Sequence, residues 1–188
     1  MQDFALVSEG PTDHPILKNI LIGYFKTEER EPDINLEHPD PRADINKGGW
    51  TRVLEYLRTK KFRQALQLNR YLIVQVDTDV SEESGFDVPQ QNESGPRTVS
   101  GIVEAVKLRL IQVIGTEDWQ TYGNRFIFAV AVQQTECWVL PLWEDQDAKA
   151  AKTVNCLEAL KKALQRKNRP WVQKGRKDKD LRFCLRRI

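Results

Sequence analysis

The sequence predicts an α/β fold with a mainly parallel central sheet and helices on both faces. Three short runs, at residues 4–7, 71–76 and 125–132, are apolar almost throughout and do not alternate with polar residues. Between them lie segments whose apolar residues recur at helical spacing. Strands that are apolar on both faces and alternate with helices are typical of a parallel sheet that is covered on both sides.

The first element is a short buried strand at residues 4–7. We expect Thr12 to be the N-cap of the helix that follows, with Pro15 in its first turn, where the missing N–H does no harm. The apolar residues of this helix are Ile16, Leu17, Ile20, Leu21 and Tyr24. Residues 27–47 are polar and poorly periodic, so they predict a long loop with room for one edge strand.

The middle of the chain contains the strongest predicted strand, at residues 71–76. A helix precedes it, beginning at Trp50 after the break at Gly48 and Gly49. A loop rich in Ser, Glu, Pro and Gly follows at residues 81–97, and then a helix at 99–114 that ends at Gly115. The predicted inward face of that helix consists of Val99, Val103, Val106, Leu110 and Val113.

The last elements are the strand at residues 125–132, a short helix in ECWVLPLW that ends near Pro141, and an amphipathic helix. We expect Thr153 to cap this final helix, whose apolar face contains Leu157, Leu160 and Leu164.

Composition restricts the partners of the protein only weakly. The 188 residues are 40% hydrophobic and 30% charged, and 29 Lys and Arg against 27 Asp and Glu leave a net charge of +2. Charge is unevenly distributed: residues 28–44 contain seven acidic and two basic residues, and residues 161–188 contain twelve basic and two acidic ones. The basic tail is typical of a solvated segment, and a nucleic-acid contact is the alternative interpretation.

Cysteine usage and hydropathy predict a cytoplasmic protein without membrane contact. The three cysteines, Cys137, Cys156 and Cys184, are an odd number without CxxC spacing, so we expect reduced thiols. The N-terminal apolar run is too short for a signal peptide. No stretch approaches the roughly 18–20 apolar residues that span a bilayer.

Acidic residues follow two of the predicted strands. Glu9 follows the first strand, Asp13 lies in the first turn of the next helix, and Asp77 and Asp79 follow the strand at 71–76. If the two strands are parallel neighbours, these carboxylates meet at one edge of the sheet, where they repel unless they bind a cation or take up protons. Oxygen ligands without His or Cys favour Mg²⁺ or Mn²⁺, and such a site suits phosphodiester chemistry.

Each acidic residue also has an ordinary structural interpretation. Asp13 suits the positive end of its helix, and Asp77 and Asp79 suit a turn after a strand. Glu136 follows the third buried strand, where it is either a further metal ligand or part of a helix cap after Thr135. The combination of two acidic clusters, each directly after a strand, favours a metal site.

The stretches VSEGPTDHPIL and YLIVQVDTD together resemble the Toprim domain of topoisomerases, bacterial primases and OLD-family nucleases. The EGPTD form is closer to OLD-like and small stand-alone Toprim-like proteins than to primases, and SGFDVP and QQTECWVLPLW resemble Toprim-like proteins of phage-defence neighbourhoods. The resemblance implies a Rossmann-like Toprim fold in one domain, residues 1–188. Its core covers about residues 4–143, and residues 144–188 form a C-terminal helix and basic tail.

The resemblance also implies a set of functional residues and bound Mg²⁺ or Mn²⁺. Glu9 would act on the reacting oxygen or bind the metal, Asp77 and Asp79 would be metal ligands, and Asp13 would match an additional acidic position of OLD-like nucleases. Glu136 is a further candidate ligand. In the basic tail, the candidate nucleic-acid contacts are Lys174, Arg176 and Lys177.

The expected function is therefore Mg²⁺-dependent hydrolysis of nucleic-acid phosphodiesters, with DNA as the expected substrate. The chain contains no GxxxxGK[ST] motif, so an ATPase in an antiphage complex would be a separate partner protein. A homo-oligomer is also compatible with the sequence. The alternatives are a non-catalytic Toprim-like interaction subunit and an RNA-processing Toprim ribonuclease.

Overall fold

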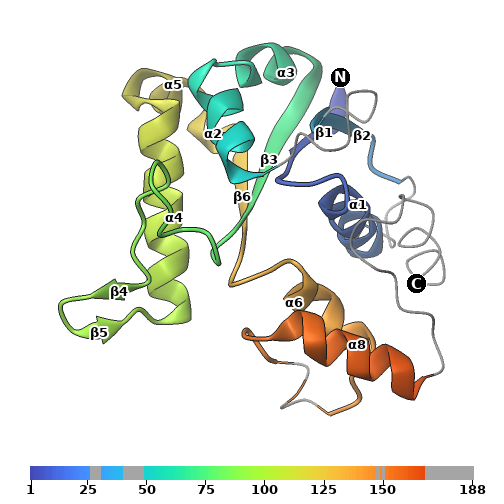
Figure 1. Ribbon diagram of the computed structural model, residues 1–188. Coiled ribbons are helices and arrows are strands. Elements are labelled where there is room, and N and C mark those ends of the chain that lie inside the picture. Colours follow the sequence, from blue (N-terminus) through green and yellow to red (C-terminus); the bar gives the residue numbers. More distant parts are fainter. Residues whose placement is uncertain (26–30, 40–48, 147–148, 150, 168–188) are drawn as a thin grey trace.

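The computed structural model describes residues 1–25, 31–39, 49–146, 149 and 151–167. Its centre is a sheet of four parallel strands in the order β2-β1-β3-β6 (Figure 1). The strands are β1 (Gln2–Val7), β2 (Ile34–His38), β3 (Asn69–Asp77) and β6 (Phe126–Ala131). The predicted α/β fold with a mainly parallel sheet is confirmed.

Helices cover both faces of the sheet, as the apolar strands require. On one face, Leu17 of α1 (Asp13–Tyr24) packs against Phe4, Leu6 and Ile73. The other face forms the largest core, covered by α2 (Trp50–Arg58), α3 (Phe62–Leu68), α4 (Val99–Ile114) and α5 (Thr116–Tyr122). None of the helices in the described segments is both long and apolar enough to cross a membrane.

The order of the strands reverses between β1 and β3. The chain leaves β1 through α1 and returns as β2 on one side, whereas it leaves β3 through α4 and returns as β6 on the other side. The helices α1 and α4 lie on opposite faces. In open parallel sheets, such a reversal marks the place beyond the carboxyl ends of the strands where ligands bind.

The elements after β6 lie beyond the carboxyl ends of the strands (Figure 1). They are α6 (Glu136–Val139), η2 (Leu140–Leu142) and α8 (Cys156–Arg166). Ile16 of α1 packs into a cluster formed by Val139, Leu140, Leu160, Ala163 and Leu164. Arg166 adds an ion pair with the buried Glu144 at 2.6 Å. Short elements complete the fold: η1 (Gly123–Arg125) and a hairpin of β4 (Gln91–Asn92) and β5 (Gly95–Pro96).

Several local predictions need correction. The helix at 99–114 has the predicted bounds, but Val99 is 53% exposed, and Ile102 and Ile114 are buried instead. Val99 is the first residue of this helix, and the buried positions begin at Ile102. The last helix begins after Asn155 rather than Thr153. The short helices α3 and α5 were not predicted.

Two of the three cysteines form a disulfide, so the expectation of reduced thiols is wrong for them. Cys137 of α6 is bonded to Cys156 at the start of α8, 19 residues later. An odd number of cysteines and the lack of CxxC spacing gave no information on this pairing, because the two residues meet only when α6 and α8 pack together. Cys184 lies outside the described residues.

Candidate metal centre at the carboxyl edge of the sheet

The structure brings Glu9 and Asp77 together. The parallel pairing of β1 with β3 sets Val7 opposite Val74, so the residues that follow both strands lie at the same edge. The backbone amide of Asp77 donates a hydrogen bond to Oε1 of Glu9 at 2.8 Å. In return, the amide of Glu9 donates to Oε1 of Gln75 at 3.2 Å. The two acidic clusters are therefore in direct contact at the strand reversal.

The carboxylate of Asp77 is half-buried and held by neutral donors. Its Oδ1 accepts one hydrogen bond from Nε2 of Gln75 at 2.8 Å and another from Oγ1 of Thr135 at 2.8 Å. Within the described residues, Asp77 has no ion pair with a lysine or arginine. The carboxyl group of Asp77 is thus oriented by the protein but has no partner cation among the residues that the structure describes.

The pKa of Asp77 is raised from 3.8 to about 8, chiefly because burial removes water from the carboxylate. The hydrogen bond from Thr135 opposes this shift. The negative charges of Asp13, Glu9 and Asp79 raise the pKa further. The charges of Glu9, Asp13 and Asp79 therefore all act on Asp77 at this edge.

Asp13 is the first residue of α1, and its Oδ2 accepts a hydrogen bond from the amide of Gly10 at 2.8 Å. The side chain of Thr12, the predicted cap, makes no capping bond. The carboxylate of Asp13 thus closes the turn between β1 and α1. This structural role and a role in the site are compatible, because the charge of Asp13 also reaches Asp77.

Asp79 lies in the turn after β3 and is exposed. Its backbone amide donates to the carbonyl of Gln133 at 3.1 Å, and its Oδ2 accepts from Nε2 of Gln134 at 2.9 Å. The extended chain that would project Asp77 and Asp79 from one face ends at Asp77. Asp79 therefore lies at the outer rim of the site, whereas Asp77 lies deeper.

Glu136 is not connected to the other candidate carboxylates by any interaction within the described residues. It is the first residue of α6, and its charge is not among those that shift the pKa of Asp77. In the part of the chain that the structure describes, Glu136 makes no hydrogen bond or ion pair with Glu9, Asp77 or Asp79. Its role as a ligand stays a prediction. Lys174, Arg176 and Lys177 lie outside the described residues.

Two side chains that contact Asp77 were not predicted from the sequence. Gln75 and Thr135 are both buried, and each contacts Asp77. Gln75 carried a signal, because it interrupts an otherwise apolar strand directly before the acidic pair. No pattern in the sequence marked Thr135 as part of the site. Its contact with Asp77 depends on the approach of the β6–α6 connection to β3.

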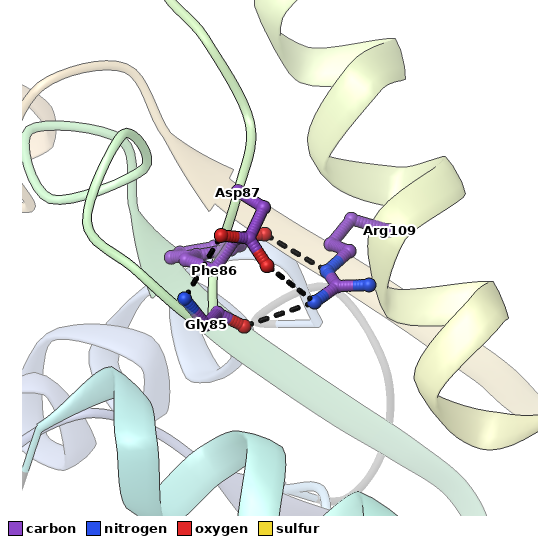
Figure 2. A network of polar contacts seen from close by, with 4 residues as sticks. All are labelled: Gly85, Phe86, Asp87 and Arg109. Atoms are coloured by element: carbon purple, nitrogen blue, oxygen red, sulfur yellow. Dashed lines mark hydrogen bonds and ion pairs between the residues drawn. The ribbon is translucent and has the colours of Figure 1, made fainter.

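The loop between Asp79 and Gln90 is fixed to α4 (Figure 2). Arg109 donates to the carbonyls of Phe86 at 2.8 Å and Gly85 at 3.0 Å, and also to Oδ2 of Asp87 at 3.0 Å. Phe86 is fully buried and stacks on Trp50. Phe86 and Val88 thus anchor the chain that follows the acidic pair in the core.

The donor set suits Mg²⁺ or Mn²⁺ in chemistry. Glu9, Asp77 and Asp79 offer carboxylate oxygens, the ligands that hard divalent cations prefer. Within the described residues, no three His, Cys, Asp or Glu side chains are grouped closely enough to form a metal cluster as they stand. One oxygen each of Glu9 and Asp77 is instead engaged by donors of the chain. The residues fit a site in which water and a substrate complete the shell of the cation.

Comparisons of the chain with family models, with curated proteins and with solved structures found no match. The resemblance to Toprim domains therefore depends on the sequence motifs alone.

Proposed function

We propose that the protein is a Mg²⁺- or Mn²⁺-dependent nuclease of the Toprim type that hydrolyses nucleic-acid phosphodiesters, with DNA as the expected substrate. The observation that carries this proposal is the contact between Glu9 and Asp77 at the strand reversal, together with the raised pKa of Asp77. A carboxylate that is costly to ionise, with three further carboxylates acting on it, is typical of a functional site.

In this proposal, Glu9, Asp77 and Asp79 hold the cation, and Asp13 adds negative charge behind them. The cation would polarise the phosphodiester and lower the pKa of an attacking water. In this proposal Glu9 would act on the reacting oxygen or bind the metal. Glu136 is a further candidate ligand, and Lys174, Arg176 and Lys177 are candidate phosphate contacts.

The test is a substrate panel of plasmid DNA, single-stranded DNA and structured RNA, incubated with Mg²⁺, Mn²⁺ or EDTA. We expect metal-dependent cleavage of DNA by the wild-type protein and none by Asp77→Asn, which keeps the size of the side chain. Glu104→Gln is the matched control, because Glu104 is exposed on α4 and, among the described residues, pairs with Lys107. Cleavage that persists in Asp77→Asn would refute the mechanism, and preferential cleavage of RNA would favour the RNA-processing alternative.

A second candidate function is a non-catalytic interaction subunit. It is favoured by the finding that no three acidic side chains in the described segments are grouped as a formed metal cluster. In this case the acidic edge binds a cation or a basic partner surface. Cation binding without cleavage of any substrate in the panel, with or without a partner ATPase, would support this candidate.

We also propose that the protein is the effector of an antiphage complex, with an ATPase supplied by a second protein. The absence of a GxxxxGK[ST] motif supports a separate motor, if one is needed. Co-purification with the products of neighbouring genes, followed by the same cleavage panel with ATP, tests this assignment.

A further inference from the structure

Gln75 is a fully buried amide in the middle of the sheet. Its side chain is 0% exposed and lies between apolar neighbours on β3. A buried amide is costly unless all of its polar atoms have partners. The partners of Gln75 therefore indicate why a polar side chain occupies this position.

Every hydrogen bond of the Gln75 side chain leads to the candidate site. Oε1 accepts from the amide of Glu9, and Nε2 donates to Oδ1 of Asp77 at 2.8 Å and to Oγ1 of Thr135 at 3.0 Å. The orientation of the amide group is fixed by these partners, because a backbone N–H needs an acceptor and a carboxylate needs a donor. Gln75 thus connects the ends of β1 and β3 with the connection that follows β6.

Thr135 completes this network from the other side. It is 2% exposed, and its hydroxyl accepts from Gln75 and donates to Oδ1 of Asp77 at 2.8 Å. Because Nε2 of Gln75 donates the hydrogen of its contact with Thr135, the single hydroxyl proton of Thr135 is directed at Asp77. Gln75 and Thr135 act on Asp77 as a pair.

The consequence for Asp77 is that its two oxygens differ. Both side-chain hydrogen bonds that the described residues donate to this carboxylate fall on Oδ1. A carboxylate with one oxygen held by two buried donors cannot rotate without breaking both bonds. The other oxygen, Oδ2, then keeps a fixed direction.

We propose that Gln75 and Thr135 are positioning residues of the cation site: by holding Oδ1 of Asp77, they would fix the carboxylate in the orientation in which it binds the cation. This inference rests on the proposed function, because it assigns the way in which that same site binds its metal. Partners of this kind, which orient a ligand without touching the metal, typically change metal affinity by about 10- to 100-fold when they are removed.

The ordinary alternative is that Gln75 only satisfies buried polar groups and stabilises the sheet. Asn69 provides a matched control for this role. It is also a 0% exposed amide on β3, but it lies at the opposite end of the strand and donates to the carbonyl of Ala65. Its loss removes a buried amide from the same strand without touching the candidate site.

The experiment is calorimetric titration of the full chain with Mn²⁺ alone, with thermal unfolding of each variant as the check of folding. We expect Gln75→Met to weaken Mn²⁺ binding by about 10- to 100-fold, and Asn69→Leu to leave it unchanged. Thr135→Val should weaken binding, whereas Thr135→Ser, which keeps the hydroxyl, should retain wild-type affinity. A purely structural role would not distinguish these pairs.

The outcomes separate the two proposals. Wild-type binding of Mn²⁺ that is retained in both Gln75→Met and Thr135→Val would overturn the positioning role and leave the proposed function intact. Failure of the wild-type protein to bind Mn²⁺ would overturn the proposed function and the inference with it. If Gln75→Met does not fold, the comparison of Thr135→Val with Thr135→Ser decides the question.

Discussion

The main-chain amide of Asp77 donates a hydrogen bond to the carboxylate of Glu9, which lies 68 residues earlier in the chain, at 2.8 Å. Because the donor belongs to the backbone, replacing the side chain of Asp77 leaves this bond in place. Variants at Asp77 therefore change the chemistry of the site without releasing Glu9 from β3. This property makes Asp77 the most informative position for substitution.

The first prediction concerns the pH dependence of stability without metal. The pKa of Asp77 is 3.8 in the unfolded chain and about 8 in the folded protein, so the folded protein binds this proton more tightly. The stabilising contribution of the proton is complete below the unfolded pKa and disappears as the pH rises through about 8. We expect Asp77→Asn, which cannot ionise, to lose less stability between about pH 5 and about pH 9.

The measurement is the free energy of unfolding in urea, with EDTA present. Near pH 9, Asp77→Asn should be more stable than the wild-type protein by on the order of 2 kcal/mol, because the wild-type carboxylate is then charged and poorly solvated. Parallel pH profiles of the two proteins would contradict the raised pKa. The Glu104→Gln variant should follow the wild-type profile, since Glu104 is exposed.

The second prediction concerns stabilisation by metal. A cation that binds only the folded protein stabilises it by about 2.7 kcal/mol at 100 times its dissociation constant, which corresponds to a rise in Tm of about 5–10 °C for a chain of this size. We expect this rise with Mn²⁺ in the wild-type protein and its loss in Asp77→Ala. An equal rise in both proteins would show that the cation binds elsewhere.

The third prediction concerns the bond between Cys137 and Cys156. Cross-linking residues 19 positions apart restricts the unfolded chain, which corresponds to about 3 kcal/mol. We expect Cys156→Ser, or a reducing agent, to lower the free energy of unfolding by about this amount. Cys184→Ser is the control and should respond to reductant as the wild-type protein does. Unchanged unfolding on reduction would indicate that the thiols are not bonded in solution.

The fourth prediction concerns the loop that Arg109 fixes to α4. Arg109→Ala removes the hydrogen bonds to the carbonyls of Gly85 and Phe86, so it should cost about 1–3 kcal/mol and increase amide exchange around Phe86. Lys107→Ala on the same helix removes only an exposed pair with Glu104 and should cost about 0.5 kcal/mol or less. Hydrogen exchange measured by mass spectrometry compares the two variants, and equal exchange near Phe86 would contradict the role of Arg109.

The regular part of the fold could be predicted from the sequence because it depends on local patterns. The apolar runs gave β1, β3 and β6, and the spacing of apolar residues with Gly115 as a stop gave α4 with its observed bounds. The short helices α3 and α5 have only seven residues each, which is too few for a clear helical period. The prediction that Val99 faces inward was wrong, because helical periodicity alone does not say at which turn of the helix the packed part begins.

The candidate site was predictable only in part. The positions of Glu9 and Asp77 after two strands indicated that they meet, since parallel strands end at the same edge. The different depths of Asp77 and Asp79 depend on the turn after Asp77, which the sequence pattern did not specify. The contacts of Thr135 and the pairing of Cys137 with Cys156 depend on how α6 approaches the sheet and α8, and no local pattern contains that information.

The chain leaves β1 and β3 in opposite directions, with α1 and α4 on opposite faces of the sheet. The position of a binding site at this edge and the identity of its ligand therefore depend on different features. The position of the site follows from the route of the backbone, which the buried core maintains. The chemistry of the site depends instead on a few side chains at the strand ends. Substitution of those few residues would adapt the same site to another ligand with little loss of stability. A catalytic homologue of this chain and one that only binds a partner could therefore differ by a few substitutions.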